Sequence, residues 1–150
     1  MQNLSRYSAF LGAVFATISP AFAGSSSFLV VVGNGALAGT YNLDAKAVFC
    51  FHSAKRRVYS AVWKDYNPSN AKSIAEAGIE VINPDAAGPK VATVQITFGD
   101  PDKAQAVYRI SAQPVSLTVS GSRGEIVFQG KTQNGISIHL TAVCLDTAEA

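Results

Sequence analysis

Apolar and polar residues alternate with a period of two along most of this chain, which is the pattern of half-buried β-strands. The alternation is clearest in residues 90–98, where Val94, Ile96 and Phe98 fall on one face. Glycine, proline, asparagine and aspartate separate the apolar segments, as turn residues do. We expect strands at residues 28–32, 47–53, 57–64, 78–82, 90–98, 105–111, 115–119, 125–129 and 135–144.

Residues 47–53 and 57–64 form the clearest predicted hairpin. One segment, residues 68–77, predicts a short helix, with Asn67 as its N-cap and Gly78 just past its end. Short strands at spacings near ten residues are typical of two packed antiparallel sheets or of a closed barrel. The sequence therefore predicts an all-β protein, an antiparallel β-sandwich with a closed β-barrel as the alternative, carrying one short helix.

The N-terminal residues 1–23 have the pattern of a secretory signal peptide. Arg6 supplies the positive charge, residues 9–18 form the apolar core, and residues 21–23 give a small-x-small cleavage site. A membrane anchor is the rival interpretation, but a spanning helix needs about 20 apolar residues, so we expect no membrane span. Residues 24–150 have an ordinary length for a single domain, the predicted β-sandwich.

The charges of the mature chain are nearly balanced. The full sequence has 12 basic and 10 acidic residues. The predicted signal peptide holds one of the basic residues, so 11 basic and 10 acidic residues remain in the mature chain. This balance gives no reason to expect a nucleic acid or an anionic membrane as a partner.

The two cysteines, Cys50 and Cys144, both lie in the mature part. In an oxidising compartment such a pair is most simply one disulfide, which would join residues 94 apart in the sequence. Two free thiols, acting as ligands or as a redox pair, are the alternative, but the C-x-x-C spacing is missing. Together with the signal peptide, the pair predicts a periplasmic or secreted protein of a bacterial envelope.

The sequence offers little that resembles a catalytic site. It has two histidines, His52 and His139, and His139 falls on the opposite strand face from Cys144, which argues against a zinc site. No Gly-x-Ser-x-Gly motif is present, and most carboxylates stand beside glycine or proline in predicted turns. We therefore expect no enzyme, no metal and no cofactor.

The predicted hairpin carries an unusual number of aromatic and basic residues. If Cys50 faces the core, its neighbours in the strand project to the opposite face, and a sheet with several aromatics outside is either covered or a binding surface. The basic turn would suit an anionic sugar or an acidic partner, so we predict a protein or a carbohydrate partner. The candidate binding residues are Phe49, Phe51, Tyr59, Trp63, Lys55, Arg56 and Arg57.

Three parts of the chain carry a resemblance to a known family: an apolar strand ending at Gly33, the strand 47–50, and the C-terminal ending with residues 128–131 and 136–144. Their layout resembles the mycobacterial lipoprotein antigen family of small surface β proteins. The resemblance implies a disulfide-tied sandwich at the cell envelope, without enzymatic activity and with a role in surface interaction. This sequence departs from the family because it lacks the lipid-accepting cysteine, so membrane anchoring is not carried over.

The sequence thus predicts an exported, non-catalytic binding or surface-interaction protein. The alternative is a small periplasmic inhibitor of a hydrolase such as lysozyme, although the signature loop of those inhibitors is missing here.

Overall fold

The structure, a computed structural model, describes residues 26–100, 103 and 106–149, so the predicted signal peptide lies outside the described part. Within that part, ten strands form one continuous sheet in the order β10-β3-β4-β5-β6-β7-β8-β9-β1-β2. The strands are β1 (Ser27–Val32), β2 (Gly39–Leu43), β3 (Val48–Ser53), β4 (Val58–Lys64), β5 (Ile74–Ile82), β6 (Lys90–Phe98), β7 (Val107–Ser120), β8 (Arg123–Lys131), β9 (Ser137–Cys144) and β10 (Ala148–Glu149), and a single-turn 3-10 helix, η1 (Ala45–Ala47), precedes β3.

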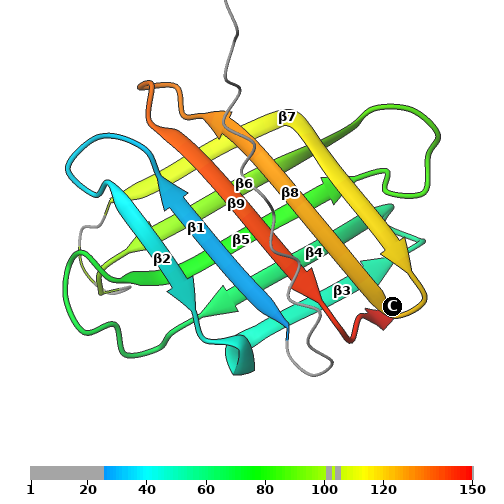
Figure 1. Ribbon diagram of the computed structural model, residues 1–150, viewed down its shortest axis with the longest axis horizontal. Helices are drawn as coiled ribbons and strands as arrows, with labels where there is room; N and C mark the ends of the chain where they lie inside the picture. Colours follow the sequence, from blue (N-terminus) through cyan, green and yellow to red (C-terminus); the bar gives the residue numbers. More distant parts are fainter. Residues whose placement is uncertain (1–25, 101–102, 104–105, 150) are drawn as a thin grey trace, which may run out of the picture.

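The sheet curls over into two facing layers, and the long strand β7 forms the corner between them (Figure 1). Its residues up to Val115 pair with β6, and those from Val115 onward pair with β8. The bend has a local cause, because Ala112 adopts a left-handed backbone conformation with φ of 51° and the pairing register shifts opposite it. The layers are therefore β3 to β6 on one side and β8, β9, β1 and β2 on the other.

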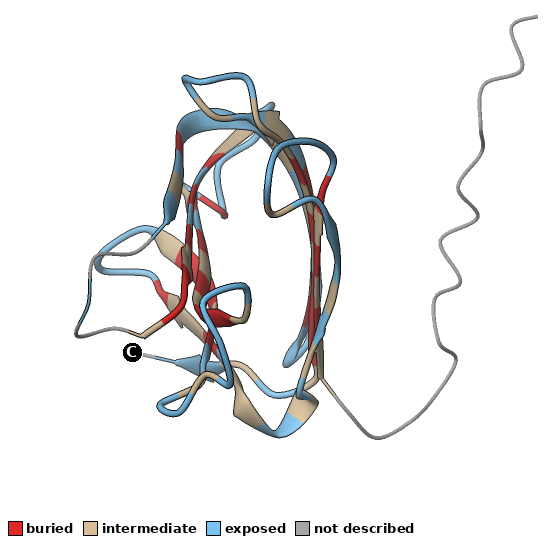
Figure 2. Cartoon of the chain, turned by 90° about the vertical axis from the view of Figure 1, so that its left-hand side faces the viewer, coloured by how far each residue is buried: buried red, intermediate tan, exposed pale blue. Residues whose placement is uncertain are grey.

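The core lies between the two layers, where the buried residues of both face each other (Figure 2). Burial alternates along β1, β6 and β8, as the hydrophobic pattern predicts. The predicted all-β fold is thus confirmed, and since β10 and β2 each have one neighbour, the sheet is open at both edges. The largest fully buried side chains are Tyr59, Phe28, Phe98 and Phe128.

The predicted disulfide is confirmed. Cys50 in β3 is bonded to Cys144 in β9, and the Cα atoms are 5.9 Å apart. The bond joins β3, near the edge of one layer, to β9 in the middle of the other layer. These two strands are not hydrogen-bonded neighbours in the sheet. It ties together residues 94 apart in the sequence.

The prediction of a helix at residues 68–77 is wrong. Residues 65–73 form a loop of turns, in which the Asn70 side chain accepts a hydrogen bond from the Lys72 amide at 2.8 Å. Such side-chain bonds compete with helix formation. The chain pairs with β6 from Ile74 onward and also with β4 from Glu76 onward, and Ile74 and Ala77 are part of the core between the layers. The strand β5 therefore begins four residues earlier than the predicted strand at 78–82.

Three further elements differ from the predictions. The strands predicted at residues 105–111 and 115–119 are not separate, because within the described residues β7 runs without a break from Val107 to Ser120. The strands β2 and β10 were not expected. Both are short strands at the edges of the sheet, and β2 has an irregular burial pattern.

Candidate functional site

The β3–β4 hairpin forms as predicted, and its register decides which aromatic rings reach the surface. Cys50 pairs with Ala61, and the same face of the hairpin carries Tyr59 and Trp63, which are 1% and 7% exposed. The Trp63 Nε1–H donates to the backbone oxygen of Asp44 at 3.1 Å. These two rings are part of the core and do not belong to an outer binding surface.

Phe49 and Phe51 project to the opposite, outer face of the same hairpin. Phe49 is 59% exposed, whereas Phe51 is half-buried. The four rings that the sequence singled out therefore divide into two core residues and two outer ones. Only the outer pair can contact a partner of the folded protein.

A row of residues in cross-strand register continues from Phe49 across the outer face. Val62, Gly78, Gln95 and Arg109 follow it on β4, β5, β6 and β7. A Cβ atom on Gly78 would have Val62 Cγ2 at 3.9 Å as its nearest neighbour, so the missing side chain leaves a gap in the row. Beyond the gap, Arg109 Nε donates to Gln95 Oε1 at 3.2 Å. We call these five residues the Phe49 face.

The basic residues lie at the β3–β4 turn, and Lys55, Arg56 and Arg57 are all exposed. Arg57 has a left-handed backbone conformation with φ of 55°, and its backbone oxygen accepts a hydrogen bond from the amide of Asn83 at 2.8 Å. This bond joins the turn to the β5–β6 loop. A depression of about 310 Å³ lies between the two, lined by Ala54, Arg57, Asn83, Pro84, Asp85 and Ala86.

His52 lies at this end of the sheet, between two carboxylates from distant parts of the chain. Its Nδ1 is 2.8 Å from Oε2 of Glu149 in β10, and its Nε2 is 3.0 Å from Oδ2 of Asp85 in the β5–β6 loop. The His52 side chain is 19% exposed, while the carboxylates are 70% and 69% exposed. We call these three residues the His52 cluster.

The hydrogen bond to Asp85, supported by the one to Glu149, raises the pKa of His52 above its ordinary value, although burial opposes the shift. The pattern fits an imidazolium that donates an N–H to each carboxylate. In this protonated form, neither ring nitrogen has a lone pair that could accept a proton. Reasoning from the sequence missed both partners of His52, because Asp85 has the pattern of an ordinary turn residue.

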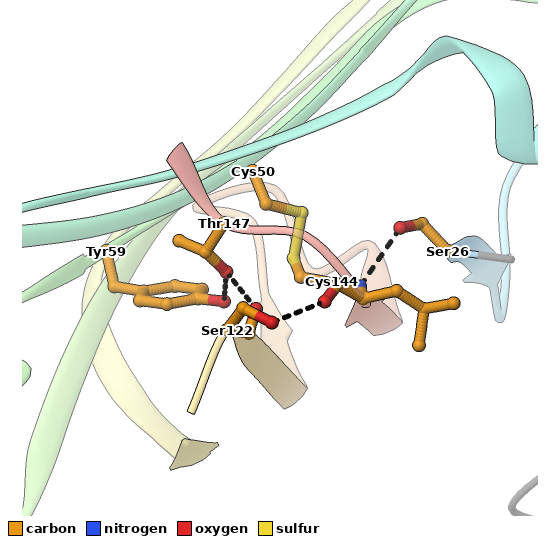
Figure 3. Close-up of a disulfide and its surroundings, with 7 residues drawn as sticks. Ser26, Cys50, Tyr59, Ser122, Cys144 and Thr147 are labelled. Carbon is orange, nitrogen blue, oxygen red and sulfur yellow. Dashed lines mark hydrogen bonds between the residues drawn. A yellow bond between two sulfur atoms is a disulfide. The ribbon is translucent and has the colours of Figure 1, made fainter. Parts of the chain in front are cut away.

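Hydrogen bonds also connect Tyr59 with residues near the C-terminus and in the β7–β8 turn (Figure 3). The Tyr59 hydroxyl is 2.8 Å from Oγ1 of Thr147. The Thr147 hydroxyl in turn donates to the backbone oxygen of Ser122 at 2.8 Å. Burial raises the pKa of the Tyr59 phenol. The Cys50–Cys144 disulfide lies beside this chain of hydrogen bonds, so covalent and polar links between the layers are gathered at one end.

In the described part of the chain, no group of three or more His, Cys, Asp or Glu side chains is arranged to hold a metal ion. The same part contains no helix long and apolar enough to cross a membrane. The fold and these surfaces define a disulfide-tied all-β protein built from one curled sheet. Comparison with models of protein families, with curated proteins and with solved structures finds no match for this chain, so the resemblance to the mycobacterial antigens stays a prediction.

Proposed function

We propose that this is an exported, non-catalytic binding protein that contacts its partner through the Phe49 face. The observation that carries the proposal is the 59% exposed ring of Phe49 at the start of a row that ends in a hydrogen-bonded amide and guanidinium. Aromatic and arginine side chains are enriched in protein interfaces, where a few of them supply most of the affinity. The gap at Gly78 gives the side chain of a partner room beside the ring.

Other observations support the class of protein. The disulfide is of the kind that persists in oxidising compartments, which agrees with the signal-peptide pattern of residues 1–23 and with a periplasmic or secreted location. The hydrogen bonds on both nitrogens of His52 disfavour its use as a general base. The resemblance to surface antigens points to the same class.

We favour a protein over a carbohydrate as the partner, because the Phe49 face combines one apolar ring with a charged group rather than several exposed rings. Capture experiments with the mature protein, residues 24–150, test this. Immobilised wild type and F49A are incubated with envelope and extracellular extracts and with a panel of polysaccharides. The matched control is Y66A, which removes another exposed ring, in the β4–β5 loop.

We expect wild type and Y66A to capture the same protein and F49A to bind it about tenfold more weakly or worse, as for a hot-spot residue. Affinities are then measured with the purified partner. Capture of a hydrolase that the wild type inhibits would favour the inhibitor alternative, and retention only by a polysaccharide would favour the carbohydrate. Equal affinities of wild type and F49A would refute a role for the Phe49 face.

A further inference from the structure

The C-terminal strand β10 has only two residues and pairs in parallel with β3 at Phe51 and His52 (Figure 1). Two parallel pairings give few backbone hydrogen bonds, so side chains must supply much of its attachment. One attachment is the contact of Thr147, just before β10, with the Tyr59 hydroxyl. Thr147 also donates to the backbone oxygen of Ser122, and the Glu149 carboxylate contacts His52 Nδ1.

The same histidine also holds the β5–β6 loop, through Asp85 on Nε2. One imidazole ring therefore connects two segments to β3. These segments are 33 and 97 residues away from His52 in the sequence. Between them is a small cavity of about 30 Å³, room for about one water molecule, with Tyr59 and Val119 in its lining. This cavity shares Pro84 and Asp85 with the larger depression at the β3–β4 turn.

An imidazole can serve two acceptors only when it is protonated. The imidazolium has two N–H donors, whereas the neutral ring has one donor and one lone pair. After deprotonation, one of the two carboxylates therefore faces a lone pair and loses its hydrogen bond. The ordinary pKa of histidine is close to neutrality and the two carboxylates raise the pKa of His52, so this change falls above the ordinary value.

The groups that face His52 come from three elements of the described chain. They are Asp85 from the β5–β6 loop, Glu149 from β10, and the Tyr59 phenol from β4, whose ring centroid is 6.1 Å from that of the imidazole. The β7–β8 side contributes Val119 and Gly121, which do not titrate. Both charged neighbours are acidic, so they favour the protonated ring.

We infer that the His52 cluster is a pH-dependent contact. When His52 is protonated, its hydrogen bonds hold β10 and the β5–β6 loop against β3, and when it loses its proton at least one of these two segments is released. Release of β10 uncovers the edge of β3 at Phe51 and opens the small cavity toward Tyr59. The inference does not depend on the role of the Phe49 face. Under this inference, pH decides whether the C-terminal strand β10 stays attached to β3.

Hydrogen exchange tests the inference in the intact mature protein. Protection of the amides of residues 147–149 and of Asn83, Asp85 and Ala86 is measured at about pH 5 and about pH 8.5, with correction for the intrinsic exchange rates. We expect protection in at least one segment to fall about three- to tenfold at the higher pH, the range for charge-assisted bonds that are partly exposed to solvent. The variant H52Q should lack this pH dependence and match the alkaline wild type.

The protein has a second histidine, His139, which lies on β9 opposite Val31 and Gln129, and H139Q therefore controls for the removal of a histidine elsewhere. An NMR titration of the His52 ring in the wild type needs no variant, and it should give a pKa above the value for the same protein unfolded in urea. Equal corrected protection at the two pH values, or the same change in H52Q, would overturn the inference.

Discussion

Gly124 is a position where the fold leaves no room for a side chain. It lies in β8, pairs with Cys144 of β9, and faces the buried ring of Tyr59 across the core. A Cβ atom built on Gly124 would overlap the Tyr59 hydroxyl oxygen and would stand 2.5 Å from the ring carbon Cζ. Carbon atoms in contact are ordinarily about 3.5–4.0 Å apart. The substitution G124A must therefore displace the ring or part the two layers.

The cost of G124A follows from what fixes the ring. Tyr59 is 1% exposed and its hydroxyl bonds to Thr147, so a displaced ring loses both packing and a hydrogen bond. Overpacking a core costs about 1–3 kcal/mol, and a lost hydrogen bond adds about 1 kcal/mol. Replacing a strand glycine by alanine returns about 0.5–1 kcal/mol. Together these terms predict that the free energy of unfolding falls by about 1–3.5 kcal/mol.

Urea unfolding with the disulfide intact measures this loss, and G78A is the matched control. Gly78 is also a strand glycine, but its added Cβ would meet nothing closer than 3.9 Å, so G78A should be neutral or slightly stabilising. In a double-mutant cycle, Y59F should recover part of the loss, because it removes the overlapping oxygen. If G124A is as stable as G78A, the layers are not packed through Tyr59 and Gly124 as described.

Three other predictions concern the same core and its edges. The double variant C50A/C144A should lose about 4 kcal/mol of stability, because the bond restricts a loop of 94 residues in the unfolded chain, and urea unfolding should show the same loss after reduction of the wild type. The raised folded-state pKa of His52 adds stability that is complete below the unfolded value of about 6.5 and is lost as the pH rises through the folded value. With the carboxylates about 70% exposed, this contribution is at most about 1 kcal/mol, and a series of unfolding curves against pH should flatten in H52Q. W63F should cost about 1 kcal/mol for the lost bond to the Asp44 oxygen and W63A about 3–5 kcal/mol, so equal losses in thermal or urea unfolding would contradict the buried packing of this ring.

The alternation of apolar residues was enough to predict most of the strands, because a sheet with one buried face imposes a period of two. It failed at residues 74–77, where the core side chains are Ile74 and Ala77 and a β-bulge at Ala75 interrupts the alternation. Alanine is compatible with a helix and gives little hydrophobic contrast, so the capping residues nearby favoured the wrong element. The backbone hydrogen bonds that make this segment a strand come from β4 and β6. Which residues of those strands pair with it depends on the register, which the local sequence does not contain.

The candidate site could be predicted only in part. The period of two correctly separates Phe49 from Cys50, but which face Tyr59 shares with Cys50 depends on how the chain turns between the two strands. The His52 cluster had no local signal at all, since Asp85 and Glu149 are brought to the histidine by separate connections of the fold. Gly124 likewise looked like a turn residue, whereas its role is to admit a ring from the opposite layer.

The contacts that the β3–β4 hairpin makes on its inner face also determine which residues lie on its outer face. Cys50, His52 and Tyr59 place the disulfide, the His52 cluster and the Gly124 contact on one face of β3 and β4. A shift of register by one residue would turn every side chain of a strand to the other face, so it would break all three links together. The exposure of Phe49 is therefore a consequence of the buried cysteine beside it, because the bond that fixes Cys50 inward leaves Phe49 no direction except outward.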